Sequence, residues 1–102
     1  MQVVVDKNGQ IRLEDLDDFR NFQVTLEDVI SHEALKAAID TVGHLDGEGA
    51  VWIHEAALRK LGRDDAKWQE QLTAMIAGAA RYGWIDADTG DIRAHVVGSI
   101  RD

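Results

Sequence analysis

A long apolar helix ahead of Gly83 constrains the fold of this 102-residue chain more than any other stretch. Its apolar side chains recur with helical spacing and share one face: Trp68, Leu72, Met75, Ile76 and Ala79. Asp64 or Asp65 can cap the amino end, and Gly83 can adopt the left-handed conformation that ends a helix. Residues 84–85 and 92–97 flank an Asp/Gly turn and predict a hairpin that folds back beside the helix. We therefore expect the rest of the chain to pack on this helix and hairpin.

The amino-terminal residues predict a second hairpin. Residues 1–13 carry apolar runs on both sides of Asn8-Gly9, which is the strongest short turn signal because both central residues need positive φ. Residues 14–24 then form an acidic connector, whose apolar anchors are Leu16, Phe19 and Phe22. At this length we expect one domain over residues 1–102, with a helical core and the carboxyl-terminal hairpin in residues 25–102.

Local capping and turn signals divide the middle of the chain. Thr25 and Asp28 have the spacing of a capping box, which predicts the start of a helix. Glycines end helices readily, and clusters of Gly, Asp and His between apolar segments predict loops. The predicted elements are therefore a helix at 25–42 stopped by Gly43, a loop at 44–49, a buried strand or helix lead-in at 50–53, and a helix at 54–61 stopped by Gly62.

Composition narrows the class of protein. The chain has no cysteine, which excludes disulfides, thiol catalysis and thiolate metal sites, and it has no proline. No apolar run approaches the roughly 20 residues of a membrane span, and residues 1–6 lack the features of a signal peptide, so we expect a cytoplasmic protein. The formal net charge is −8, and eleven of the nineteen acids lie in residues 1–49. Such an acidic surface repels phosphate backbones, which disfavours nucleic-acid binding.

The sequence holds no motif for catalysis or metal binding. The Asp/Gly turns miss the ligand spacing of a calcium loop. His54 opens a helix with Glu55, but no second histidine follows four positions later, so the zinc-protease spacing is absent. We expect no metal, no cofactor and no enzymatic activity. One alternative is a small-molecule binding protein or enzyme, with a site formed by His54, Glu55 and His95 beside Trp52 and Trp84.

The order of elements from residue 26 resembles the winged-helix arrangement, in which a helix-turn-helix precedes a hairpin called the wing. Residues 52–58 correspond to the first helix of the pair, 62–65 to the turn, 68–82 to the second helix and 83–85 to the lead into the wing. The resemblance implies an α+β fold with three main helices, and a second helix that reads the major groove of DNA. In this alternative, a transcription regulator, the DNA-binding residues are Arg59, Lys60, Arg63, Lys67 and Arg93. The second helix itself offers only Lys67 and Arg81 against Glu70, a surface that can neutralise few phosphates, and this counts against the alternative.

Our first hypothesis is a non-enzymatic interaction domain, either an accessory or regulatory subunit or a homodimer. The outer face of the long helix holds only small residues, which let another backbone approach closely, followed by a basic one: Ala74, Ala77, Gly78 and Arg81. Such a face is either covered within the fold or contacts a partner. We expect the helix to be central and covered, and an exposed face would imply a partner.

Overall fold

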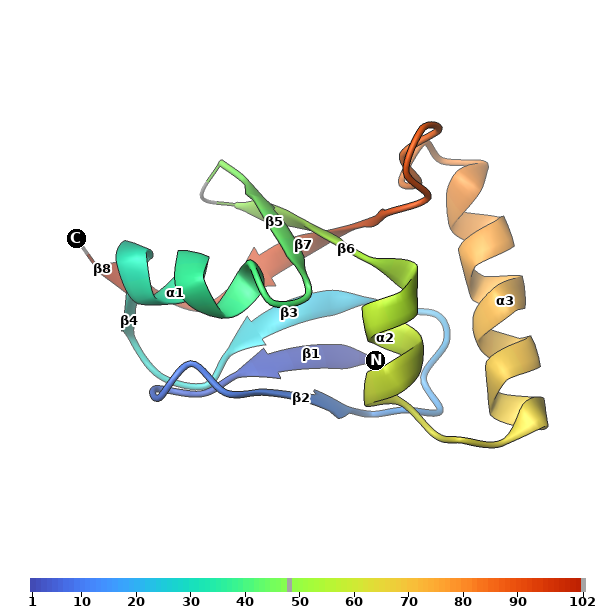
Figure 1. Ribbon diagram of the computed structural model, residues 1–102, viewed down its shortest axis with the longest axis horizontal. Coiled ribbons are helices and arrows are strands. Elements are labelled where there is room, and N and C mark those ends of the chain that lie inside the picture. Colours follow the sequence, from blue (N-terminus) through green and yellow to red (C-terminus); the bar gives the residue numbers. More distant parts are fainter. Residues whose placement is uncertain (48, 102) are drawn as a thin grey trace.

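Six strands form one mixed sheet in residues 1–47 and 49–101, which are the residues that the computed structural model describes (Figure 1). The strands are β1 (Gln2–Val5), β2 (Ile11–Glu14), β3 (Gln23–Leu26), β5 (Gly43–Asp46), β6 (Ala50–Ile53) and β7 (Ile92–Val97). They lie in the order β2-β1-β3-β7-β6-β5, with β3 parallel to both of its neighbours and the other pairs antiparallel. A separate parallel pair joins β4 (Ile30–Ser31) to β8 (Ile100–Arg101).

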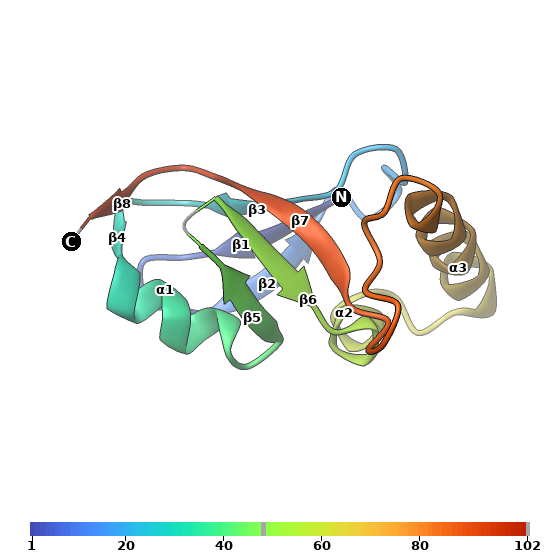
Figure 2. The ribbon, with the colours of Figure 1, turned by 90° about the horizontal axis from the view of Figure 1, so that it is seen from above.

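Three helices in this described part of the chain complete an α+β domain: α1 (His32–Ile39), α2 (Glu55–Leu61) and α3 (Ala66–Ala80). Figure 2 shows α1 and α2 against one face of the sheet and α3 beyond one end of it. The side chains buried between the sheet and these helices include Val3, Val24, Leu35, Ile39, Ile53, Leu58 and Ile92. None of the described helices covers the opposite face, where strand alternation places Gln23, Thr25, Trp52, Arg93 and His95. None of them is long and apolar enough to cross a bilayer.

The predicted amino-terminal hairpin is confirmed. Strand β1 pairs antiparallel with β2 along its whole length. Asp6 holds the turn, because its Oδ1 accepts hydrogen bonds from the backbone N–H groups of Asn8 at 2.8 Å and Gln10 at 3.0 Å. Gly9 has a φ of +78°, the left-handed conformation for which the Asn-Gly pair is suited.

The helix predicted at 25–42 is wrong at its start, where β3 forms instead. The N-cap of α1 is Ser31, whose Oγ accepts a hydrogen bond from the Ala34 N–H at 3.1 Å. Thr25 lies in the sheet, and its hydroxyl donates to Oε1 of Gln2 at 2.6 Å. Strands on both sides satisfy the backbone groups of β3, so long-range pairing outweighs the local capping pattern.

Gly43, which we predicted to end a helix, begins strand β5. This strand pairs antiparallel with β6 and replaces the first half of the loop predicted at 44–49, of which residue 48 lies outside the described residues. A Cβ at Gly43 would lie 1.8 Å from the carbonyl oxygen of Trp52, so the close approach of the two strands requires glycine. Of the two alternatives for residues 50–53, the strand forms, as β6, and the predicted short helix ending at Gly62 is confirmed as α2.

The predicted long helix is confirmed as α3, but the segment after it differs from the predicted hairpin. Asp65 accepts a hydrogen bond from the Trp68 N–H at 2.9 Å, and Gly83 has a φ of +76°. Ile85 forms one isolated antiparallel bridge with Ile92, whereas β7 lies inside the sheet between β3 and β6. A two-stranded ribbon alone is marginally stable, and these neighbours satisfy β7 on both edges. The sheet is thus larger than a hairpin, and the winged-helix arrangement is not confirmed.

The position of α3 corrects our expectation that this helix is central. Figure 1 shows it standing at one end of the molecule. Within α3, Trp68 and Leu72 are buried, whereas Ala74 and Ala77 are exposed. The sheet face that a central helix would need is already occupied by α1 and α2, so α3 packs at the end of the sheet through one side only.

Candidate functional site

Two adjoining cavities beside α3 form the candidate site, which we call the α3 groove. The first cavity, of about 320 Å³, opens on the uncovered face of the sheet, and the second, of about 310 Å³, lies against the carboxyl-terminal half of α3. The residues that line both are Arg20, Phe22, Trp84 and Arg93. The first is also lined by Asn21, Gln23, Ala94, His95 and Val97, and the second by Phe19, Ala74, Met75, Gly78, Ala79, Tyr82 and Ile92.

Segments from distant parts of the sequence meet in the groove because β3 pairs with β7. Their parallel register sets Gln23 beside His95, which brings the end of the acidic connector next to the last long strand. A turn closed by Asp18 holds Arg20 at this place. The Asp18 carboxylate accepts hydrogen bonds from the Asn21 side chain at 3.2 Å and from the Arg20 backbone N–H at 3.1 Å, and these lower its pKa below the ordinary value.

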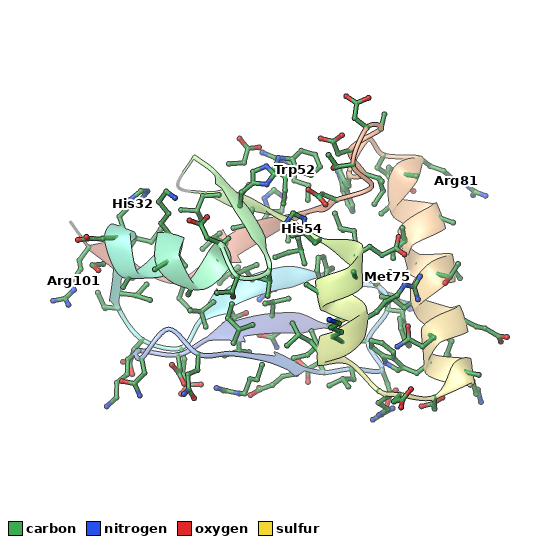
Figure 3. All side chains as sticks on the ribbon, viewed as in Figure 1. His32, Trp52, His54, Met75, Arg81 and Arg101 are labelled. Atoms are coloured by element: carbon green, nitrogen blue, oxygen red, sulfur yellow. The ribbon has the colours of Figure 1, made fainter. Side chains whose placement is uncertain are left out.

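The second cavity exists because the side chains on this part of α3 are small. Ala74, Gly78 and Ala79 do not reach the connector, and a Cβ placed on Gly78 would meet no other atom within 4 Å. Met75 is the largest residue that α3 contributes to the lining, and Figure 3 shows it on the side of the helix that faces α2. A flexible thioether against small neighbours makes a wall that can adapt to different side chains.

The groove is basic although the protein is acidic. Of the described residues, no Asp or Glu lines either cavity, while the sequence as a whole holds nineteen acids and eleven Lys and Arg residues. Nε of Arg93 donates to Oδ2 of Asp46 at 3.2 Å, whereas the Arg20 side chain makes no ion pair or hydrogen bond with any described residue. Two arginines thus line each cavity, and no described residue forms an ion pair with Arg20.

Two aromatic rings stand at the mouth of the groove. Tyr82 is 73% exposed and Trp84 is 50% exposed, and their ring centroids lie 5.4 Å apart with a tilt of 33°. The backbone N–H of Arg93 donates to the Trp84 carbonyl at 2.8 Å and ties this rim to the sheet. Tyrosine, tryptophan and arginine are the residue types that contribute most to binding at protein interfaces.

The loop behind Trp84 is held by Asp86. Its Oδ1 accepts hydrogen bonds from the backbone N–H groups of Asp88 at 2.8 Å and Thr89 at 3.1 Å. Both bonds favour the charged carboxylate and so lower the pKa of Asp86 below its ordinary value, and the bond from Asp88 has the larger effect. The hydrogen-bonded loop thus fixes the aromatic rim relative to β7.

Two of the predicted partner-binding residues, Ala74 and Gly78, line the second cavity. Ala77 is exposed, and Figure 3 shows Arg81 projecting away from the body of the molecule. Sequence reasoning missed Arg20 and Phe22 as site residues, although the spacing of Phe19 and Phe22 marked them as apolar anchors of the connector.

The residues predicted for DNA binding have mostly structural partners. Arg59 joins α2 to α3, because its guanidinium contacts Glu55 at 2.9 Å, Oε1 of Gln69 at 2.9 Å and Oγ1 of Thr73 at 2.8 Å. Arg63 pairs with Asp17 at 2.6 Å. Lys60 and Lys67 are exposed, and Arg93 lines the α3 groove.

The two histidines of the predicted small-molecule site lie near opposite ends of β6. His95 is opposite Ala50, whereas His54 follows the other end of β6, a separation of about 13 Å at 3.3 Å per residue. His95 shares the first cavity with Trp84, but neither cavity includes His54 or Glu55.

His54 instead pairs with a buried acid. Its Nδ1 lies 2.8 Å from Oδ1 of Asp91, which is 5% exposed and directly precedes the last long strand. This contact joins the N-cap of α2 to the residue before β7. In the described part of the chain, no group of three His, Cys, Asp or Glu side chains could hold a metal ion.

Comparison of the chain with protein-family models, with curated proteins and with solved structures finds no match.

Proposed function

We propose that this protein is a non-catalytic interaction domain that binds a partner protein in the α3 groove. The observation that carries this proposal is the exposure of Tyr82 and Trp84 at the mouth of a preformed groove. Exposed aromatic surface beside a cavity is typical of binding sites, because contact with a partner removes it from water. The small residues Ala74 and Gly78 support the proposal, since they leave room for a partner to approach α3.

A pair of neighbouring substitutions tests the groove. Gly78 lines the second cavity, and a Cβ added to it would meet no other atom within 4 Å, so Gly78→Phe should place its ring in the cavity. Ala77→Phe adds the same side chain at an exposed position of α3 and is the matched control. We expect a random peptide library displayed on phage to yield clones that bind the wild type and Ala77→Phe. The same clones should lose binding to Gly78→Phe by about tenfold or more.

The outcomes separate the alternatives. Failure to enrich any clone, or equal binding to both variants, would overturn the proposed function. Multi-angle light scattering of the purified protein distinguishes the two forms of the hypothesis. A concentration-dependent dimer that Gly78→Phe dissociates would make the partner a second copy, and a monomer would make the protein an accessory subunit for another chain.

A further inference from the structure

We infer that the α3 groove binds an acidic peptide segment that carries a bulky apolar side chain. This inference rests on the proposed function and names the chemistry of the partner. In the bound state, a carboxylate of the segment lies between Arg20 and Arg93, and its apolar side chain enters the cavity against α3.

The positions of the two arginines support the binding of an acidic residue. Arg20 and Arg93 both line each cavity, so an occupant of either one lies beside both arginines. Guanidinium binds carboxylate through parallel hydrogen bonds, which are stronger than bonds between neutral groups. Arg20 is free of described partners, so a bound carboxylate would not have to displace a competing acid from it. His95 adds a third polar group that can donate in the first cavity.

The net negative charge of the whole chain favours a short acidic peptide over a nucleic acid as the bound anion. With a net charge of −8, the protein repels anions at most of its surface and attracts them at this groove. A nucleic acid carries a charge at every residue and would extend from the groove onto repulsive surface. A short acidic segment concentrates its charge at the arginines, and its remaining residues can be neutral.

The second cavity carries the apolar half of the inference. Its walls include the rings of Phe22, Tyr82 and Trp84, together with the flexible side chain of Met75. A volume of about 310 Å³ is at the lower end of the range for ligand sites, roughly 300 to 1,000 Å³, and suits about one or two side chains. An aromatic or long aliphatic side chain would therefore be buried here while the adjacent carboxylate contacts Arg20.

The chain's own acidic connector does not supply this segment. Its apolar anchors already contact the core of their own chain. The Trp68 Nε1–H donates to the Leu16 carbonyl at 2.9 Å, and the centroid of the Phe19 ring lies 6.1 Å from that of the Trp68 ring. A second copy could offer this connector to the groove only by breaking its own packing. The proposed occupant is therefore a segment of another protein, and not the connector of a second copy.

The peptides selected on the wild-type protein test this inference directly. We expect acidic residues next to an aromatic or leucine residue to be enriched over the unselected library. The best clone, made as a fluorescein-labelled peptide, should bind Arg20→Glu about tenfold or more weakly than wild type by fluorescence anisotropy. Lys67→Glu makes the same change of charge at an exposed position of α3 that lines neither cavity, and it should change the Kd by less than about threefold. Circular dichroism and urea unfolding confirm that both variants are folded.

Several results would overturn the inference. The selected peptides could lack an enrichment of Asp and Glu and still lose binding to Gly78→Phe. This result would support the proposed function but contradict an acidic partner. Equal Kd values for the wild type and Arg20→Glu would do the same. A labelled oligodeoxythymidine of about 20 nucleotides tests the nucleic-acid alternative at about 50 mM salt. Binding that is lost in Arg20→Glu but kept in Lys67→Glu would assign the groove to nucleic acid. Indole-3-acetate binding as tightly as the peptide would assign it to a small aromatic carboxylate.

Discussion

The two halves of α3 continue one apolar stripe, but its fully buried side chains, Trp68 and Leu72, lie in the amino-terminal half, whereas Met75 and Ile76 in the other half are only partly buried. In the anchored amino-terminal half, Trp68 is 2% exposed and its Nε1–H donates to the Leu16 carbonyl. In the open half, Ala74 and Gly78 line a cavity, and the helix leads to Tyr82, which is 73% exposed. One continuous helix therefore connects a region that is fixed to the core with a region that is available to a ligand.

Side-chain size explains the difference between the two halves. Burying a large apolar side chain stabilises a fold by about 1.5–3 kcal/mol, whereas alanine and glycine have little surface to bury. Trp68 and Leu72 are buried in the core, Met75 and Ile76 pack against it only in part, and the alanines and glycine between and after them add little surface to bury. Stability should therefore depend on the anchored half and binding on the open half. The predictions that follow test this division.

The largest effect is expected for the tryptophans. Trp68→Ala removes a side chain buried against Phe19 and Gly62, and it should lower the free energy of unfolding by about 3–5 kcal/mol. Trp84→Ala removes a half-exposed ring and should cost less than about 1 kcal/mol. Urea unfolding followed by far-ultraviolet circular dichroism measures both. An equal loss of unfolding free energy in Trp84→Ala and Trp68→Ala would contradict the division of α3 into an anchored half and an open half.

The glycines give the next effect, and its sign differs between the two sites. A Cβ at Gly62 would lie 1.9 Å from the Trp68 ring, so Gly62→Ala should cost about 1–3 kcal/mol through overpacking. Gly78 is inside α3 with open space around it, so Gly78→Ala should stabilise by up to about 1 kcal/mol through helix propensity. Thermal unfolding of both variants measures the difference. A stabilising Gly62→Ala would show that Trp68 is loosely held.

The N-cap of α3 should have a smaller effect. Asp65 accepts a hydrogen bond from the Trp68 N–H at 2.9 Å, so Asp65→Ala should lower the free energy of unfolding by about 1 kcal/mol. Asp64→Ala removes the adjacent exposed acid, which makes no side-chain hydrogen bond to a described residue, and it is the control. Denaturant midpoints of the two variants should differ. Equal midpoints would mean that the acidic charge near the helix end matters more than the cap itself.

Local signals in the sequence predicted α3 well, because its limits depend on nearby residues. Asp65 caps the helix through a residue three positions away, and the left-handed Gly83 follows its end. The strand β3 was not predictable in this way. Thr25 and Asp28 favour a helix locally, whereas the pairing of β3 with β7 depends on residues about 70 positions later in the chain. Gly43 was misassigned for the same reason, since its role is set by the backbone of Trp52.

The candidate site was predictable on α3 and in part on the segment after it, where Trp84 and His95 were predicted for a small-molecule site and line the first cavity, but not on the connector. Ala74 and Gly78 stood out as small residues on an otherwise apolar helix, and both line the groove. Arg20 and Phe22 come from the connector more than 50 residues earlier, and their position depends on the unpredicted β3–β7 pair. A basic residue between two aromatic anchors in an acidic stretch was the available signal, but it gave no indication of which element it faces.

The smallest effect concerns the loop that fixes the aromatic rim. Hydrogen bonds from the Asp88 and Thr89 N–H groups lower the pKa of Asp86 in the folded protein, below the ordinary value of 3.8 that applies when it is unfolded. The carboxylate therefore stabilises the fold above this value, and its contribution is lost as the pH falls below 3.8 through the folded pKa. Asp86→Asn keeps an acceptor oxygen but cannot titrate, so the free energy of unfolding should fall less steeply with acid below about pH 4. Urea unfolding between about pH 2.5 and 6 measures the slope, with Asp88→Asn as a control for net charge. An unchanged slope would mean that the backbone of the loop, and not the charge of Asp86, holds Trp84 at the open end of α3.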